Sequence, residues 1–142
     1  MNKHVEKAKE LRNATPMVHN CAQTIMEVYA NDLGINKELA NHLGCNFGGG
    51  MKCGSVCGAI TSGLMVLGAK GIDSPAKVNH FIKTISNNHK GLVNCTDLLK
   101  NQLLIIFDNP THQYLDTYDD VLQDNKRVLQ KHDLKENLLI LL

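Results

Sequence analysis

The chain has 142 residues, 43% of them hydrophobic, and its 15 basic residues nearly balance its 14 acidic ones. This length fits a single domain over residues 1–142 that can bury an ordinary core. The near-neutral charge without a basic stripe argues against nucleic acid as a partner. We expect no membrane span, because no apolar run approaches the length required.

Apolar residues recur at offsets of three and four along most of the chain, which predicts helices. Gly48-Gly49-Gly50 is the exception, because consecutive glycines cost too much backbone entropy in a helix. No alternating pattern is long enough for a sheet, although Leu103 to Phe107 is ambiguous. In chain order, we expect helices over 3–13, from Thr15-Pro16 to about Leu33, over 37–43, from Cys53 or Gly54 to about Ala69, from Ser74-Pro75 to near Gly91, and from Cys95 to about Leu104.

The C-terminal part, about 111–142, is expected to be a polar helical tail that ends in the apolar run Leu138 to Leu142. That run is too short to cross a membrane and is expected to dock on the core or on a partner chain. Together these segments predict an all-α fold, a single compact bundle of about five to seven helices.

Five cysteines in a chain that begins without a signal-peptide pattern indicate a reducing, cytoplasmic setting. Cysteines there more often bind metals, react or lie buried than form structural disulfides. Cys53 and Cys57 are four residues apart, so on a helix they would share one face with Cα atoms about 6 Å apart, within disulfide range. The helix N-terminus expected at Cys53 and the adjacent Lys52 would both favour a thiolate.

Two other interpretations of the cysteines stay open. Cys21, Cys53, Cys57 and Cys95 are also a candidate ligand set for zinc or an iron–sulfur cluster. Paired two-residue spacings are missing, but helical bundles can gather ligands from separate helices. Alternatively, the cysteines are inert core residues, the interpretation favoured for Cys45, and the chain is a scaffold or interaction protein.

Histidines offer weaker signals. His19 lies two residues before Cys21, and His42 lies three before Cys45. Either is a candidate ligand or proton partner, and His19 is the better one, because a base near a thiol activates it. Most of the seven histidines are expected at the surface.

Four sequence pieces together resemble the C_GCAxxG_C_C family, small proteins described as redox-active. The pieces are Asn20 to Gln23, Phe47 to Met51, Cys57 to Gly63 and Asn94 to Leu99, and they match in order over a family-like core of about 17–100. The resemblance implies an all-helical domain with clustered cysteines and an association with oxidoreductase or transport systems. It implies that Cys21, Cys57 and Cys95 are family cysteines. The family has a further cysteine toward its C-terminus, which is either lost here or replaced by Cys53.

The function predicted from these observations is thiol-based redox chemistry, either dithiol–disulfide exchange or electron transfer. Cys57 and Cys53 are the predicted reactive pair, and Cys21 and Cys95 are neighbours from other helices. The protein would be a thiol oxidoreductase or an accessory to one, with a redox partner protein or a small thiol as its partner. A homo-oligomer is a further expectation.

Overall fold

The computed structural model describes residues 3–107, so the expected tail at 111–142 and the docking of its last residues lie outside the described part. Within it, the only β contact is an isolated antiparallel bridge between Val56 and Asn94. The all-α prediction is therefore confirmed. The helices are α1 (Lys3–Asn13), α2 (Cys21–Tyr29), α3 (Lys37–Gly44), α4 (Gly58–Ala69), α5 (Pro75–Asn88) and α6 (Cys95–Phe107), with a short irregular turn, η1 (Gly50–Gly54), before α4.

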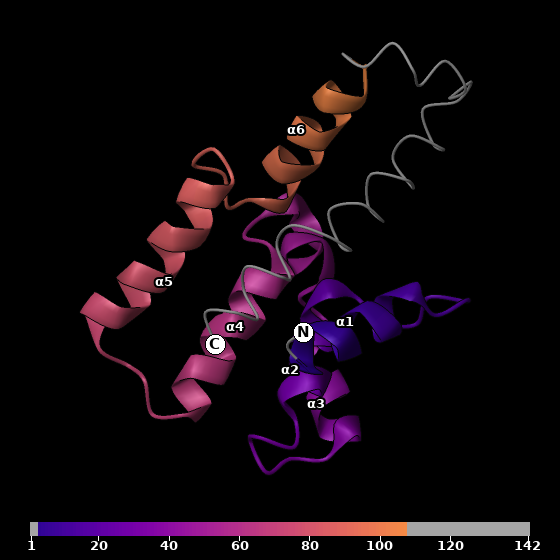
Figure 1. Cartoon of the computed structure of the whole chain (residues 1–142), viewed down its shortest axis with the longest axis vertical. Coiled ribbons are helices and arrows are strands. Elements are labelled where there is room, and N and C mark those ends of the chain that lie inside the picture. Colours follow the sequence, from indigo (N-terminus) through magenta and orange to yellow (C-terminus); the bar gives the residue numbers. More distant parts are fainter. Residues whose placement is uncertain (1–2, 108–142) are drawn as a thin grey trace.

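Helix α2 lies at the centre of the packing, in contact with α1, α3 and α4 (Figure 1). In the same view α4 separates these helices from α5. Ile25 and Tyr29 of α2, Ile60 and Val66 of α4, and Ile85 of α5 are fully or almost fully buried. This shared aliphatic core fixes α2 against α4 and so positions the start of each helix. None of the helices over residues 3–107 combines the length and apolar character that a membrane crossing requires.

The predicted helix starting at Thr15-Pro16 is wrong at both ends. Helix α2 begins only at Cys21, because the Asn20 side chain accepts a hydrogen bond from the Gln23 N–H and the Gln23 side chain accepts one from the Asn20 N–H. This reciprocal capping box defines a helix start more strongly than an upstream proline does. The helix ends at Tyr29, and the turn that follows reaches Gly34, whose φ is +68°.

The other helices agree more closely with the sequence. Asn36 and Ser74 cap α3 and α5 as expected from their side-chain chemistry. The ambiguous run from Leu103 to Phe107 belongs to α6. The helix expected from Cys53 or Gly54 is wrong in its start, since α4 begins at Gly58.

Asn20 has a larger structural role than an ordinary cap. Its Nδ2 also donates to the carbonyls of Gly44 and Cys45, at 3.2 and 3.1 Å, and so ties α2 to the end of α3. We expect Asn20→Ala to lower the free energy of unfolding by about 2 kcal/mol or more, against about 1 kcal/mol for Asn36→Ala, whose side chain caps α3 through Leu39 N–H. Urea denaturation of both variants measures the difference. Equal losses would show that the ties to α3 add nothing.

A buried thiol cluster at three helix N-termini

Three of the five cysteines lie where helices begin. Cys21 is the first residue of α2, Cys57 immediately precedes α4 as its N-cap residue, and Cys95 is the first residue of α6. Backbone N–H groups in the first turn of a helix lack partners within the helix, and the helix dipole is positive there. Both effects favour negative charge on a nearby sulfur.

Backbone hydrogen bonds hold Cys57 and Cys95 next to each other. The Cys57 N–H donates to the Val93 carbonyl at 2.9 Å, and the Cys95 N–H donates to the Ser55 carbonyl at 2.7 Å. These two bonds surround the bridge between Val56 and Asn94. The loop before α4 and the loop before α6 therefore run antiparallel, and each delivers a cysteine directly after the bridge.

Gly58 lets Cys21 approach the start of α4. A Cβ atom added at Gly58 would overlap the Phe47 carbonyl oxygen and lie 2.8 Å from Cys21 Sγ. Both contacts are shorter than a real Cβ atom tolerates. Only glycine therefore leaves room for the Cys21 sulfur at this position. Cys21 and Cys57 are almost completely buried, with 6% and 7% of their surface exposed.

The Cys57 thiol is held in its protonated form. Its side-chain hydrogen bond with Cys21 raises the pKa of Cys57 well above the ordinary value, and burial and the charges of Cys21 and Cys95 act in the same direction. The Ala59 backbone N–H opposes this shift of the pKa without reversing it. Close contact with Cys21 therefore disfavours a thiolate at Cys57.

Cys53 does not share a helix face with Cys57. Gly49, Gly50, Met51 and Lys52 all have φ between 57° and 64°, a left-handed run that separates Cys53 from α4. The Cys53 side chain is exposed, and its Sγ donates to the Gly50 carbonyl at 3.4 Å. The helical premise for pairing it with Cys57 is thus wrong, although its predicted role in redox chemistry stays a prediction.

Glycine permits the left-handed run. The conformation is costly for residues with a Cβ, and Met51 and Lys52 adopt it here. An added Cβ at Gly50 would overlap the Ser55 carbonyl oxygen, and the Ser55 N–H donates to the Gly50 carbonyl at 2.9 Å. This close turn delivers the chain from Phe47 to the bridge at Val56.

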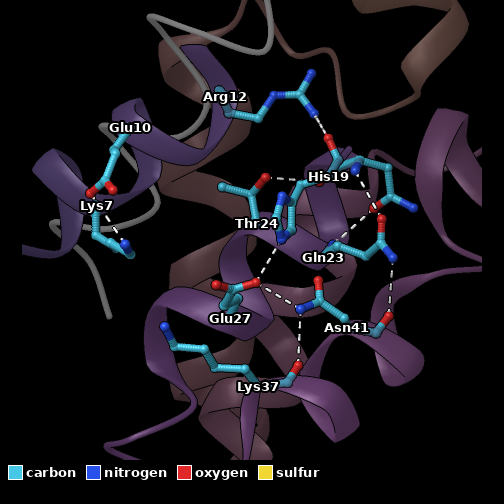
Figure 2. A network of polar contacts seen from close by, with 10 residues as sticks. Lys7, Glu10, Arg12, His19, Gln23, Thr24, Glu27, Lys37 and Asn41 are labelled. Carbon is cyan, nitrogen blue, oxygen red and sulfur yellow. Dashed lines mark hydrogen bonds and ion pairs between the residues drawn. The ribbon is translucent and has the colours of Figure 1, made fainter. Parts of the chain in front are cut away.

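His19 lies beside the cluster in a separate polar network (Figure 2). Its Nε2 is 2.6 Å from Glu27 Oε2, which also accepts a hydrogen bond from Asn41 Nδ2 at 2.7 Å. Burial alone would raise the pKa of Glu27, but the hydrogen bonds from Asn41 and His19 outweigh it and lower the pKa. One nitrogen of His19 is therefore committed to Glu27. His42 is exposed on α3.

Arg12 is the residue near the site that sequence reasoning missed. It is 3% exposed, and its Nη1 donates to the His19 carbonyl just before the start of α2 (Figure 2). Burial lowers the pKa of Arg12 to about 10, while the charge of Cys21 acts in the opposite direction. A signal was present, because Arg12 continues the i, i+3, i+7 series of Val5 and Ala8, the other buried residues of α1.

The predicted metal site receives no structural support. Over residues 3–107, no group of three or more His, Cys, Asp or Glu side chains is arranged to hold a metal ion. The zinc and iron–sulfur interpretations therefore stay predictions. Cys45, expected to be inert, is half-buried at the end of α3.

The fold and the site define the class of this protein as an all-α protein with a buried thiol cluster built from helix N-termini. The family model for "Putative redox-active protein (C_GCAxxG_C_C)" matches residues 19–128, and the chain belongs to that family. The resemblance stated from the sequence is thereby confirmed. Comparisons with curated proteins and with solved structures gave no match.

Proposed function

We propose that Cys21 and Cys57 form a reversible dithiol–disulfide pair through which the protein passes two electrons. The observations that carry this proposal are the burial of both thiols and the approach of Cys21 Sγ to the start of α4, to within 2.8 Å of where a Cβ at Gly58 would lie. A hydrogen bond between the two thiols, which raises the pKa of Cys57, agrees with this geometry. A hydrogen-bonded pair of sulfurs can join with little movement of the backbone, whereas a disulfide between distant cysteines requires rearrangement. No disulfide joins any of the five cysteines, all of which lie within residues 3–107, in this structure.

The exchange balances with a disulfide as the oxidant. One thiolate of the pair attacks a sulfur of the substrate disulfide, forms a mixed disulfide and releases one substrate thiolate. The second thiol loses its proton and attacks the protein sulfur of the mixed disulfide. The Cys21–Cys57 bond forms, the second substrate thiolate leaves, and the substrate has gained two electrons. The reverse sequence reduces the pair.

The burial of both sulfurs favours a small disulfide or thiol as the direct partner. Cys95 is half-buried beside Cys57 and is the more accessible member of the cluster. Two sulfurs that are 6% and 7% exposed suit a small molecule better than a protein surface. A redox protein as the final partner, a cytoplasmic setting and a homo-oligomer stay predictions.

A redox titration tests the function. The full chain is equilibrated anaerobically in buffers of reduced and oxidised dithiothreitol, its thiols are blocked with a maleimide, and the blocked thiols are counted by intact mass. We expect two of the five thiols to disappear together in one two-electron step, with three retained. Five thiols retained in every buffer would contradict the proposal and favour the scaffold interpretation with inert cysteines.

A further inference from the structure

We propose that Arg12 is a positioning residue that stabilises the negative charge on Cys21, so that Cys21 is the attacking sulfur and Cys57 the resolving one. This inference rests on the proposed function, because it assigns directions to the two sulfurs of the same pair. It adds a residue outside the cysteine motifs and states which of the two sulfurs attacks the substrate first.

The first support is an incomplete set of hydrogen bonds. Arg12 is almost completely buried, yet among the described residues no acceptor reaches its Nε or Nη2 atom. A buried guanidinium with two unpartnered N–H groups is costly unless an anion is close. A thiolate at Cys21 would supply such a negative charge.

The second support is the direction of the side chain. Nη1 of Arg12 donates to the carbonyl of His19, the residue before the cap of α2, and Figure 2 shows the guanidinium reaching from α1 toward this segment. The group is therefore held against the N-terminus of α2, where Cys21 is the first residue. Charge on Arg12 and charge on Cys21 interact across this gap.

The other titratable groups around Cys21 also favour negative charge on Cys21 rather than on Cys57. Cys57 comes from the start of α4, and its contact with Cys21, its burial and the charges of Cys21 and of Cys95 from α6 all raise its pKa. Nε2 of His19 is held by Glu27. Arg12 is thus a cation placed to act on Cys21, and the positive end of α2 adds to its effect.

The assignment completes the exchange proposed above. The Cys21 thiolate, held by Arg12, attacks the substrate disulfide and becomes the protein half of the mixed disulfide. The negative charge of Cys21 is carried away by the substrate thiolate that is released. Cys21 is then uncharged and no longer opposes ionisation of Cys57. Cys57 then releases its proton to solvent and attacks Cys21 sulfur, which closes the disulfide and releases the second substrate thiolate.

Arg12→Met tests the assignment, with Lys7→Met as its control, because both changes remove one positive charge from α1 and Lys7 is a solvent-accessible residue paired with Glu10. The probe is methyl methanethiosulfonate, a small reagent that transfers a methylthio group to a thiolate. Its rate at each cysteine is followed against pH by peptide mass spectrometry. Arg12→Lys is the second variant, which keeps the charge.

In Arg12→Met we expect the pH midpoint for modification of Cys21 to rise by about one unit or more and the rate at neutral pH to fall about 10-fold. Lys7→Met should change neither, and Arg12→Lys should restore the midpoint in part. A purely structural role of Arg12 would change stability without moving the midpoint of Cys21 alone.

Two results would overturn the inference, and the first needs no variant. The first is faster modification of Cys57 than of Cys21 in the wild-type protein at neutral pH. The second is an unchanged Cys21 midpoint in a folded Arg12→Met variant. If the wild type still forms the Cys21–Cys57 disulfide, only the direction of attack fails. If the midpoint moves as expected and no such disulfide forms, the proposed function fails and the role of Arg12 stands.

Discussion

Replacing Gly58 with alanine is expected to destabilise the fold by about 1–3 kcal/mol and to separate the two sulfurs, because the new methyl group has no room. It would overlap the carbonyl oxygen of Phe47 and lie 2.8 Å from Cys21 Sγ. The hydrogen bond between the sulfurs and the burial of Cys57 both raise the pKa of Cys57. Moving the two sulfurs apart should therefore lower that pKa toward the ordinary value. Urea denaturation and the rate of Cys57 modification at pH 8 measure the two effects.

Gly68→Ala is the matched control within the same helix. An added Cβ at Gly68 has no atom within 4 Å, so this change should be neutral or stabilise α4 by up to about 1 kcal/mol through the better helix propensity of alanine. A loss of stability at Gly68 as large as that at Gly58 would attribute the effect to helix propensity rather than to crowding at the thiols. If Gly58→Ala is destabilised but the rate of Cys57 modification is unchanged, the crowding at Gly58 affects packing and not the pKa of Cys57.

Replacing Cys57 with serine is expected to abolish the two-electron step in the dithiothreitol titration, because the remaining partner of Cys21 cannot form a disulfide. Serine keeps a hydroxyl that can donate to Cys21, so the fold should persist. Cys21→Ser should have the same result. Intact mass after maleimide blocking then shows four thiols in each variant across the buffers in which the wild type loses two.

Cys53→Ser discriminates between the two candidate pairs. The structure leads us to expect an unchanged step, because the Cys53 side chain is exposed and its Sγ hydrogen bonds to the Gly50 carbonyl in its own turn. The pair expected from the sequence, Cys53 with Cys57, gives the opposite pattern: loss in Cys53→Ser and retention in Cys21→Ser. Cys45→Ser should behave as the wild type in either case.

Local capping chemistry and helical periodicity predicted most of the helices. Asn36 and Ser74 mark helix starts that the structure confirms, because a side-chain acceptor before an apolar periodic run has few other roles. The start of α4 was not predictable in this way. Cys53 and Cys57 have helical spacing, but the left-handed conformation of Met51 and Lys52 has no counterpart in the side-chain pattern. This turn also contacts α6, where Thr96 Oγ1 donates to the Gly54 carbonyl.

The thiol cluster was only half predictable. The motifs identified Cys21, Cys57 and Cys95 one by one, and family resemblance implied that cysteines cluster, but their contacts arise from tertiary packing. The approach of Cys21 to Cys57 depends on the crossing of α2 and α4 at Gly58, which spacing along one helix does not encode. Arg12 was missed for a related reason, since an arginine is expected at the surface unless its burial is known.

Disulfide mapping of the wild-type protein tests whether Cys21 pairs with Cys57. The full chain is oxidised in the dithiothreitol buffer at which two thiols have disappeared, its remaining thiols are blocked, and proteolytic peptides are sequenced by mass spectrometry without reduction. We expect a peptide pair joined through Cys21 and Cys57, with Cys45, Cys53 and Cys95 blocked. A pair joined through Cys53 and Cys57, with Cys21 blocked, would contradict it.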